Sequence, residues 1–229
     1  MVILSTYLIS SATYMSSQWP SIRRYRGILY GIAVMTGLLG IGVHSVILFD
    51  DITQQNGLYL SLPNVISLIG LQLALIAVIA AFNKQMCGFA GGILIVSSLS
   101  ELTFIWLIDQ IGNIPPVVKA LTWQIKIHIM TSIFAYGLLC AGAIIAIFAL
   151  IQDKRLRTKK ISALNSLFAP LETTEKLLFN TATAGSVLLF LSIFSGLIIL
   201  ENIYLQNQAQ QIALSITALI MFSTLVYGR

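Results

Sequence analysis

The chain has 229 residues, of which 57% are hydrophobic and only 9% are charged. Soluble domains carry about 25% charged residues, so this composition excludes a soluble globular protein and indicates an integral membrane protein. The net charge of +5 does not indicate nucleic-acid binding, because basic residues in such a chain mark its cytoplasmic loops. No polar stretch is long enough for a soluble module, so residues 1–229 are expected to form one polytopic domain.

Apolar stretches along the chain predict an all-α fold, a polytopic transmembrane helix bundle of about seven spans. A span needs about 20 mainly apolar residues. The expected spans are residues 1–17, 27–49, 60–82, 87–108, 123–151, 176–200 and 212–227, and the last is barely long enough to cross. Between the fifth and sixth spans, apolar residues recur at helical spacing after a basic run. Residues 161–168 are therefore expected to form a short helix along the inner interface.

The distribution of basic residues predicts the orientation of the bundle. With the N-terminus outside, eleven of the thirteen Lys and Arg residues fall inside, and only Lys119 and Lys126 fall outside. The eleven are Arg23, Arg24, Arg26, Lys84, Lys154, Arg155, Arg157, Lys159, Lys160, Lys176 and Arg229. The positive-inside rule therefore favours an outer N-terminus and an inner C-terminus. Trp106 and Trp123 near the outer surface, and Trp19 near the inner one, are expected in aromatic belts.

The cysteine pattern and the missing catalytic motifs exclude several functions. Cys87 and Cys140 lie in apolar segments and are expected to be small packing residues. No CxxC pair occurs, which argues against covalently attached haem and against thioredoxin-like redox chemistry. The sequence shows no nucleophile–base set and no phosphate-binding loop, so no enzymatic activity is expected.

The chain has two histidines, His44 and His128, and both lie inside predicted spans. An imidazole in hydrocarbon needs partners for its polar nitrogens. In the predicted orientation His44 lies five residues before the outer end of its span, roughly 7 Å deep. His128 lies a few residues after the outer start of its own span. We therefore expect the two rings at similar depth near the outer face, facing each other across a cavity.

The residues beside the two imidazoles suit a flat ligand. On the same helix faces lie Gly37 and Gly40 beside the first histidine, and Ser132 and Tyr136 beside the second. Two opposed neutral imidazoles can take both axial positions of a haem iron, whereas zinc prefers four ligands. An alternative stays open, in which the glycines serve helix packing and each histidine is hydrogen-bonded to a neighbouring helix.

Glu101 is a further ionisable residue inside a predicted span, about seven residues from its outer end. It can pair with Lys126 or with a ligand, or be kept protonated by burial. A proton relay or a transport pathway would use such a group.

Several segments together carry a family resemblance. They are Gly42-Val43-His44, residues 60–68 (LSLPNVISL), residues 126–129 (KIHI), residues 132–136 (SIFAY), and Pro170-Leu171 followed by residues 175–179 (EKLLF). With these segments, residues 25–229 resemble the YpjD-like branch of the CcsA/HemX family of cytochrome c assembly membrane proteins.

The resemblance implies a multi-pass protein of the bacterial inner membrane that handles non-covalently bound haem b near the outer face. His44 and His128 match the histidine positions that ligate haem in the wider family. Haem, the lipid bilayer and other cytochrome biogenesis membrane proteins are the implied partners. The family's tryptophan-rich external loop, which presents haem to apocytochrome c, has no counterpart in residues 109–120. Relatives usually continue beyond the match to residues 227–229 with a further span, which residues 1–229 lack.

Two other functions stay open. One is a HemX-like regulatory or scaffold protein, which acts on haem synthesis through a partner that contacts the basic segment 154–160. The other is a small-molecule or ion transporter that uses Glu101. Against the transporter, the sequence shows no inverted repeat and no matched pair of interrupted helices.

Overall fold

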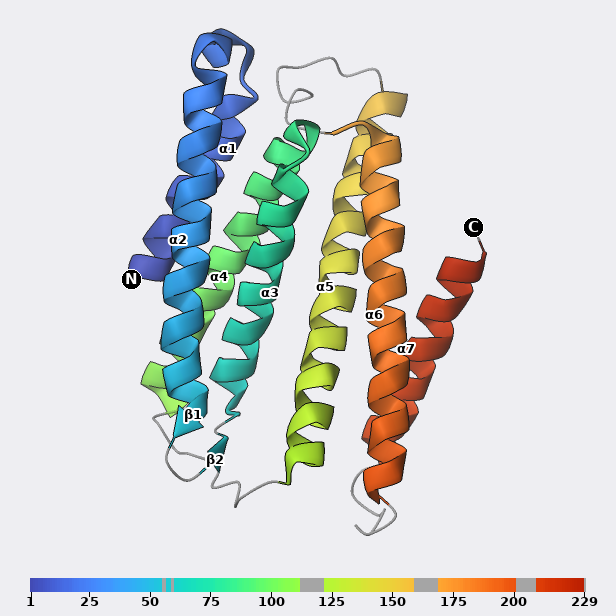
Figure 1. The fold of residues 1–229 in the computed structure, drawn as a ribbon. Helices are drawn as coiled ribbons and strands as arrows, with labels where there is room; N and C mark the ends of the chain where they lie inside the picture. The colour runs from blue at the N-terminus through green and yellow to red at the C-terminus, as the bar shows by residue number, and fades with distance from the viewer. Residues whose placement is uncertain (55–56, 59, 112–121, 159–168, 201–208, 229) are drawn as a thin grey trace.

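The computed structural model describes the chain except for residues 55–56, 59, 112–121, 159–168, 201–208 and 229. The described residues confirm the predicted all-α bundle (Figure 1). Its long helices are α1 (Val2–Ser17), α2 (Arg26–Ile52), α3 (Leu62–Ala81), α4 (Cys87–Ile111), α5 (Trp123–Arg157), α6 (Leu171–Leu200) and α7 (Ala209–Tyr227). Two short 3-10 helices, η1 (Pro20–Tyr25) and η2 (Lys84–Met86), precede α2 and α4. After α2, the strands β1 (Thr53–Gln54) and β2 (Gly57–Leu58) pair antiparallel, with Thr53 opposite Leu58.

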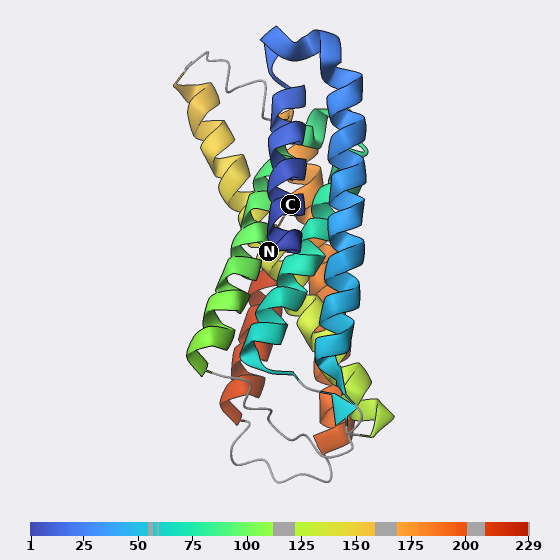
Figure 2. The same ribbon diagram turned by 90° about the vertical axis from the view of Figure 1, so that its left-hand side faces the viewer.

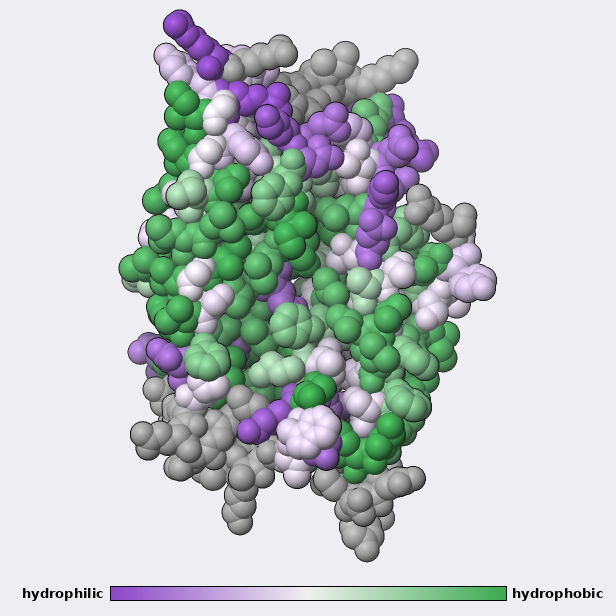
Figure 3. All heavy atoms as spheres, in the orientation of Figure 1, coloured by the Kyte–Doolittle hydropathy of each residue, from purple (hydrophilic) through white to green (hydrophobic). Residues whose placement is uncertain are grey.

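Five helical segments of the described chain are long and apolar enough to cross a membrane. They are Arg26–Ile52, Leu62–Ala81, Lys84–Gln110, Trp123–Arg157 and Leu171–Ile199. The first and last predicted spans correspond to shorter helices, since α1 has 16 residues and the apolar part of α7 is Ile212–Tyr227. Figure 3 shows a broad band of apolar surface between more hydrophilic ends, as a bilayer requires. The expected helix over residues 161–168 lies outside the described residues.

Helix α5 is longer than its predicted span, which ended at residue 151. It continues to Arg157, so that Lys154, Arg155 and Arg157 occupy its last turn. Cations there lie at the negative end of the helix dipole, and Arg157 Nε donates to Asp153 Oδ2 at 2.8 Å one turn back. These polar residues extend the helix out of the apolar layer rather than ending it.

The helices form two groups that meet along α3 and α5. We call α1–α4 the N-terminal group and α5–α7 the C-terminal group (Figure 1). Figure 2 shows α1 between α2 and α4, and both contacts are extensive. In the C-terminal group α5 and α6 form an antiparallel hairpin, and α7 packs on α6. Each group has buried apolar side chains, and the cluster that includes Ala135, Leu139 and Leu189 lies in the second group.

Glycines allow α1 to approach α2 closely. A Cβ atom at Gly40 would lie 2.7 Å from Thr6 Oγ1 and 2.9 Å from the ring of Tyr7. A Cβ atom at Gly37 would lie 3.0 Å from the hydroxyl of Ser10. The side chain of Ser10 also donates to the carbonyl of Ala33 at 2.7 Å. The alternative of helix packing is therefore correct for these two glycines, and they do not clear space for a ligand.

The contact between the two groups contains a buried amide. Gln72 of α3 is 4% exposed and lies against Gly137 of α5, where an added Cβ atom would overlap the amide oxygen. Neither Nε2 nor Oε1 of Gln72 has a hydrogen-bond partner among the described residues. A buried polar group without a partner costs free energy, so this contact contributes less stability than an apolar one would.

Candidate functional site

The two histidines lie in two different polar clusters, one in each helix group. The first, which we call the His44 cluster, consists of Tyr7, His44, Ser67 and Glu101. One residue comes from each of α1, α2, α3 and α4. All four side chains are buried, and the exposed fraction is 3% or less for each. Apolar helix faces therefore enclose a connected set of polar groups.

Hydrogen bonds occupy both ring nitrogens of His44. The Tyr7 hydroxyl lies 2.9 Å from Nδ1, and Glu101 Oε1 lies 2.8 Å from Nε2. Ser67 Oγ also lies 2.8 Å from Nε2 and donates to Glu101 Oε1 at 2.6 Å. One assignment satisfies every contact: Nε2–H donates towards Glu101 and Ser67, and Nδ1 accepts from the Tyr7 hydroxyl.

This arrangement makes the His44 cluster a cross-link of four helices. A buried carboxyl group needs partners, and His44 and Ser67 supply them. The expected alternative of a Glu101–Lys126 pair is wrong, because Lys126 lies on α5, where it lines a groove that does not include Glu101. A metal ion could bind His44 only after one ring nitrogen lost its partners. These are Tyr7 at Nδ1, and Ser67 and Glu101 at Nε2.

His128 lies in the C-terminal group and lines a pocket of about 390 Å³ between α5, α6 and α7. This volume is within the range of small-molecule sites. The lining residues are His128, Ser132, Tyr136, Ser192, Ile193, Gly196, Leu197, Ile212, Leu214 and Ser215. We call this cavity the His128 pocket. The expectation that Ser132 and Tyr136 share the face of His128 is confirmed, since all three line it.

The ring of His128 is held at one nitrogen only. Its Nδ1 lies 3.0 Å from Ser195 Oγ on α6, and Nε2 has no hydrogen-bond partner among the described residues. The ring packs on Gly196, where an added Cβ atom would lie 2.8 Å from Cε1. An imidazole fixed through one nitrogen, with the other available, is the usual state of a histidine that ligates a metal.

Hydroxyl groups continue from His128 along the pocket. Ser132 Oγ lies 2.5 Å from Ser192 Oγ and also donates to the carbonyl of His128 at 2.7 Å. The Tyr136 hydroxyl lies 2.6 Å from Ser215 Oγ on α7. These contacts join α5 to both α6 and α7. The walls of the pocket therefore combine apolar side chains with hydroxyl groups that already have partners.

The expected pair of histidines facing each other across one cavity is wrong. The partners of His44 are on α1, α3 and α4, whereas His128 contacts α6 and lines a pocket with α6 and α7. Among the described residues, the two rings share no partner and no pocket. The physical reason is that α3, not α2, is the neighbour of α5. Haem ligation by either histidine stays a prediction, but it cannot involve both rings on one iron in this arrangement.

Sequence reasoning missed Tyr7, Ser67 and Ser195 as partners of the histidines, and it did not pair Glu101 with His44. A signal for Tyr7 was present, because Tyr7, Ser11 and Tyr14 recur at helical spacing and all three are buried. Ser195 belongs to a similar stripe of small residues on α6, together with Ser192 and Gly196. Such stripes show which face of a helix is covered, but they do not show which helix covers it.

The other expected site residues have mixed outcomes. Cys87 is buried, as expected of a packing residue, but Cys140 is exposed. Among the described residues, no three His, Cys, Asp or Glu side chains lie close enough to hold a metal ion. A haem needs fewer protein ligands, because the porphyrin itself supplies four of the iron's ligands and the protein supplies only the axial ones.

Comparison with known proteins agrees with the resemblance. The family described as cytochrome c assembly protein matches residues 59–229. The chain is 26% identical over 212 residues to the inner membrane protein YpjD of Escherichia coli strain K12, covering 91% of this chain and 78% of that protein. The same values hold for the YpjD protein of Escherichia coli O157:H7. No solved structure matches the chain. The matches and the apolar helices confirm the expected multi-pass inner-membrane location.

Proposed function

The chain belongs to the cytochrome c assembly protein family, and we propose that within this family it binds haem b non-covalently through His128. The observation that carries the proposal is the ring of His128, with Nδ1 on Ser195 and Nε2 available beside a pocket of about 390 Å³. The proposed role is to hold haem in the membrane, without catalysis, while cytochrome c is assembled.

The chemistry of the pocket supports this ligand. A porphyrin is largely apolar, and Ile193, Leu197, Ile212 and Leu214 offer apolar walls to its faces. When bound, haem would supply an iron centre whose properties depend on its axial ligand. Ser195 would fix the ring plane of His128, and Gly196 leaves room for the ring against α6.

The hydrogen bonds of the two rings favour His128 over His44 as the haem ligand. Binding of iron at His44 would leave Tyr7 or Glu101 buried without its partner, at a cost of about 1–3 kcal/mol or more. Binding at His128 requires no hydrogen bond to break among the described residues. We therefore assign His44 to the stability of the N-terminal group and His128 to the ligand.

Absorption spectra of the protein purified from haem-replete cells test the proposal. The wild-type protein is expected to show a Soret band, and His128→Ala is expected to lose most of it. His44→Gln is the matched control, because it removes the imidazole and keeps polar groups in the cluster. Size-exclusion profiles establish that both variants are folded.

Two results would contradict the proposal. One is a colourless wild-type protein after haem supplementation. The other is a folded His44→Gln variant that loses its haem while His128→Ala keeps it, which would place the iron in the N-terminal group.

A further inference from the structure

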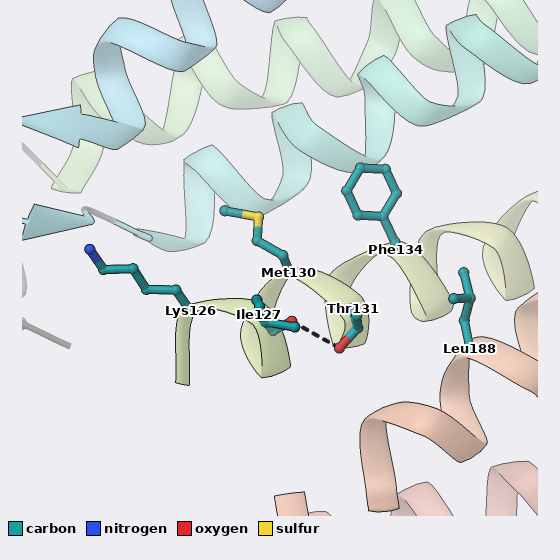
Figure 4. Close-up of a pocket in the computed structure, with 6 residues that line it drawn as sticks. All are labelled: Lys126, Ile127, Met130, Thr131, Phe134 and Leu188. Atoms are coloured by element: carbon teal, nitrogen blue, oxygen red, sulfur yellow. Dashed lines mark hydrogen bonds between the residues drawn. The ribbon is translucent and has the colours of Figure 1, made fainter. Parts of the chain in front are cut away.

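A second hollow lies on another face of α5 and shares no residue with the His128 pocket. It has a volume of about 310 Å³ and is lined by Lys126, Ile127, Met130, Thr131, Phe134 and Leu188 (Figure 4). Five of these residues come from α5 and Leu188 comes from α6. We call it the α5 groove. Ile127 and Phe134 are 52% and 42% exposed, so the groove faces the bilayer.

The α5 groove is apolar along its length and charged at one end. Among the described residues that line the groove, Lys126 alone is charged. Figure 4 shows its side chain extending away from Met130 and Phe134, towards the end of the bundle that carries the two strands. The hydroxyl of Thr131 donates to the carbonyls of Ile127 and His128 at 2.9 Å and is therefore already paired. A ligand in the groove would contact apolar side chains along the length of the groove and the ammonium group of Lys126 at one end.

Lys126 lies at the end of the apolar segment of α5, where the sequence predicts the membrane interface. It is in the first turn of α5, three residues after Trp123, which is 67% exposed and suits an aromatic belt. Phe134 lies eight residues further along, about 12 Å deeper. The groove therefore begins at the membrane interface and runs towards the bilayer centre, which is the direction of an acyl chain.

The dimensions of the groove suit a single acyl chain. A volume of 310 Å³ over a length of about 12 Å gives a cross-section of about 26 Å². A groove this narrow and about 12 Å long has the shape of one hydrocarbon chain.

We propose that the α5 groove binds an anionic phospholipid, with its phosphate on Lys126 and one acyl chain over Met130 and Phe134. The acyl chain contributes little to the choice between lipids, because the surrounding lipid tails are as apolar as the groove. The headgroup charge therefore decides which lipid binds. One lysine near the membrane surface favours an anionic lipid about fivefold over a zwitterionic one.

Native mass spectrometry of the purified full chain tests this proposal. The protein is incubated with phosphatidylglycerol or phosphatidylcholine of identical acyl chains, and retained lipid is counted. The wild-type protein is expected to retain about fivefold more phosphatidylglycerol. Lys126→Gln is expected to lower this preference about fivefold, because the contribution of Lys126 is lost while the other basic residues remain. Lys126→Arg, which keeps the positive charge at the same position, is the matched control and is expected to keep the preference.

A second variant tests the hydrocarbon part of the groove. Thr131→Trp places a large side chain in the groove and is expected to reduce retention of both lipids while Lys126 is unchanged. The helix content measured by far-ultraviolet circular dichroism verifies that each variant is folded. A phosphatidylglycerol preference that is unchanged in Lys126→Gln, or unchanged retention in folded Thr131→Trp, would overturn the proposal. Retention of haem, rather than lipid, that depends on Lys126 would also overturn it.

Discussion

The two histidines of this chain have the same chemistry but opposite surroundings. His44 lies in the N-terminal group, 1% exposed, with partners on three other helices. His128 lies at a pocket of the C-terminal group, and among the described residues its ring has one hydrogen-bond partner, at Nδ1. A histidine inside a membrane is thus not by itself a sign of ligand binding. The number of its nitrogens that neighbouring helices occupy distinguishes a structural role from a binding role.

The largest expected difference between the groups concerns the histidines themselves. His44→Leu leaves the carboxyl group of Glu101 buried without its main partner and should lower the free energy of unfolding by about 3–5 kcal/mol. His128→Leu removes one bond to Ser195 and should cost only about 0.6 kcal/mol. Unfolding in mixed micelles with increasing SDS measures both values. Equal costs for the two variants would remove the distinction between the clusters.

A second comparison uses two tyrosines. Tyr7→Phe leaves Nδ1 of His44 without its partner in a buried site and should cost about 2 kcal/mol. Tyr136→Phe removes the hydroxyl that contacts Ser215 in a side chain that is 43% exposed, and should cost about 0.6 kcal/mol. The same unfolding experiment applies. A larger effect at Tyr136 would mean that α7 contributes more to stability than the His44 cluster does.

The contact between the two groups can be weakened at Gly137. Gly137→Ala places a methyl group where the Gln72 amide lies and should cost about 1 kcal/mol, because the flexible amide can shift. In a Gln72→Ala background the same substitution should become neutral. Gly142→Ala is the control on the same helix, since nothing lies within 4 Å of its added Cβ atom. A cost that persists without the glutamine side chain would indicate that α3 and α5 meet differently.

The last comparison concerns Ser195, where the expected effect on stability is as small as at Tyr136. Ser195→Ala removes the hydroxyl that fixes Nδ1 of His128 and should change the free energy of unfolding by only about 0.6 kcal/mol. Under the proposed function it should nevertheless weaken haem retention, because the ring loses its fixed orientation. Haem titration of purified Ser195→Ala, compared with Ser186→Ala on the same helix, measures this. Equal haem affinity in both variants would show that Ser195 does not position the ligand.

Composition and the periodic placement of apolar residues determined much of the fold. Each predicted span corresponds to a helix, because a segment of hydrocarbon-compatible residues has no other way to satisfy its backbone hydrogen bonds. The positions of Ser132 and Tyr136 on the face of His128 followed from helical spacing alone. These features depend only on the geometry of a single helix, and the sequence of that helix is enough to predict them.

Only the tertiary structure decided which helix lies beside which. The sequence predicted that His44 and His128 lie at similar depth in the membrane. The depth of a residue does not determine how its helix is rotated about its axis or which helices are its neighbours. Packing of α1 between α2 and α4 gave His44 the hydroxyl of Tyr7 and the carboxyl of Glu101. Packing of α6 on α5 gave His128 the hydroxyl of Ser195, its one hydrogen-bond partner in the described part of the chain. Lipid tails are as apolar as most helix surfaces, so hydrophobicity does not choose between neighbours in a membrane. Small residues, shape and a few buried hydrogen bonds make that choice, and they act only once the helices meet.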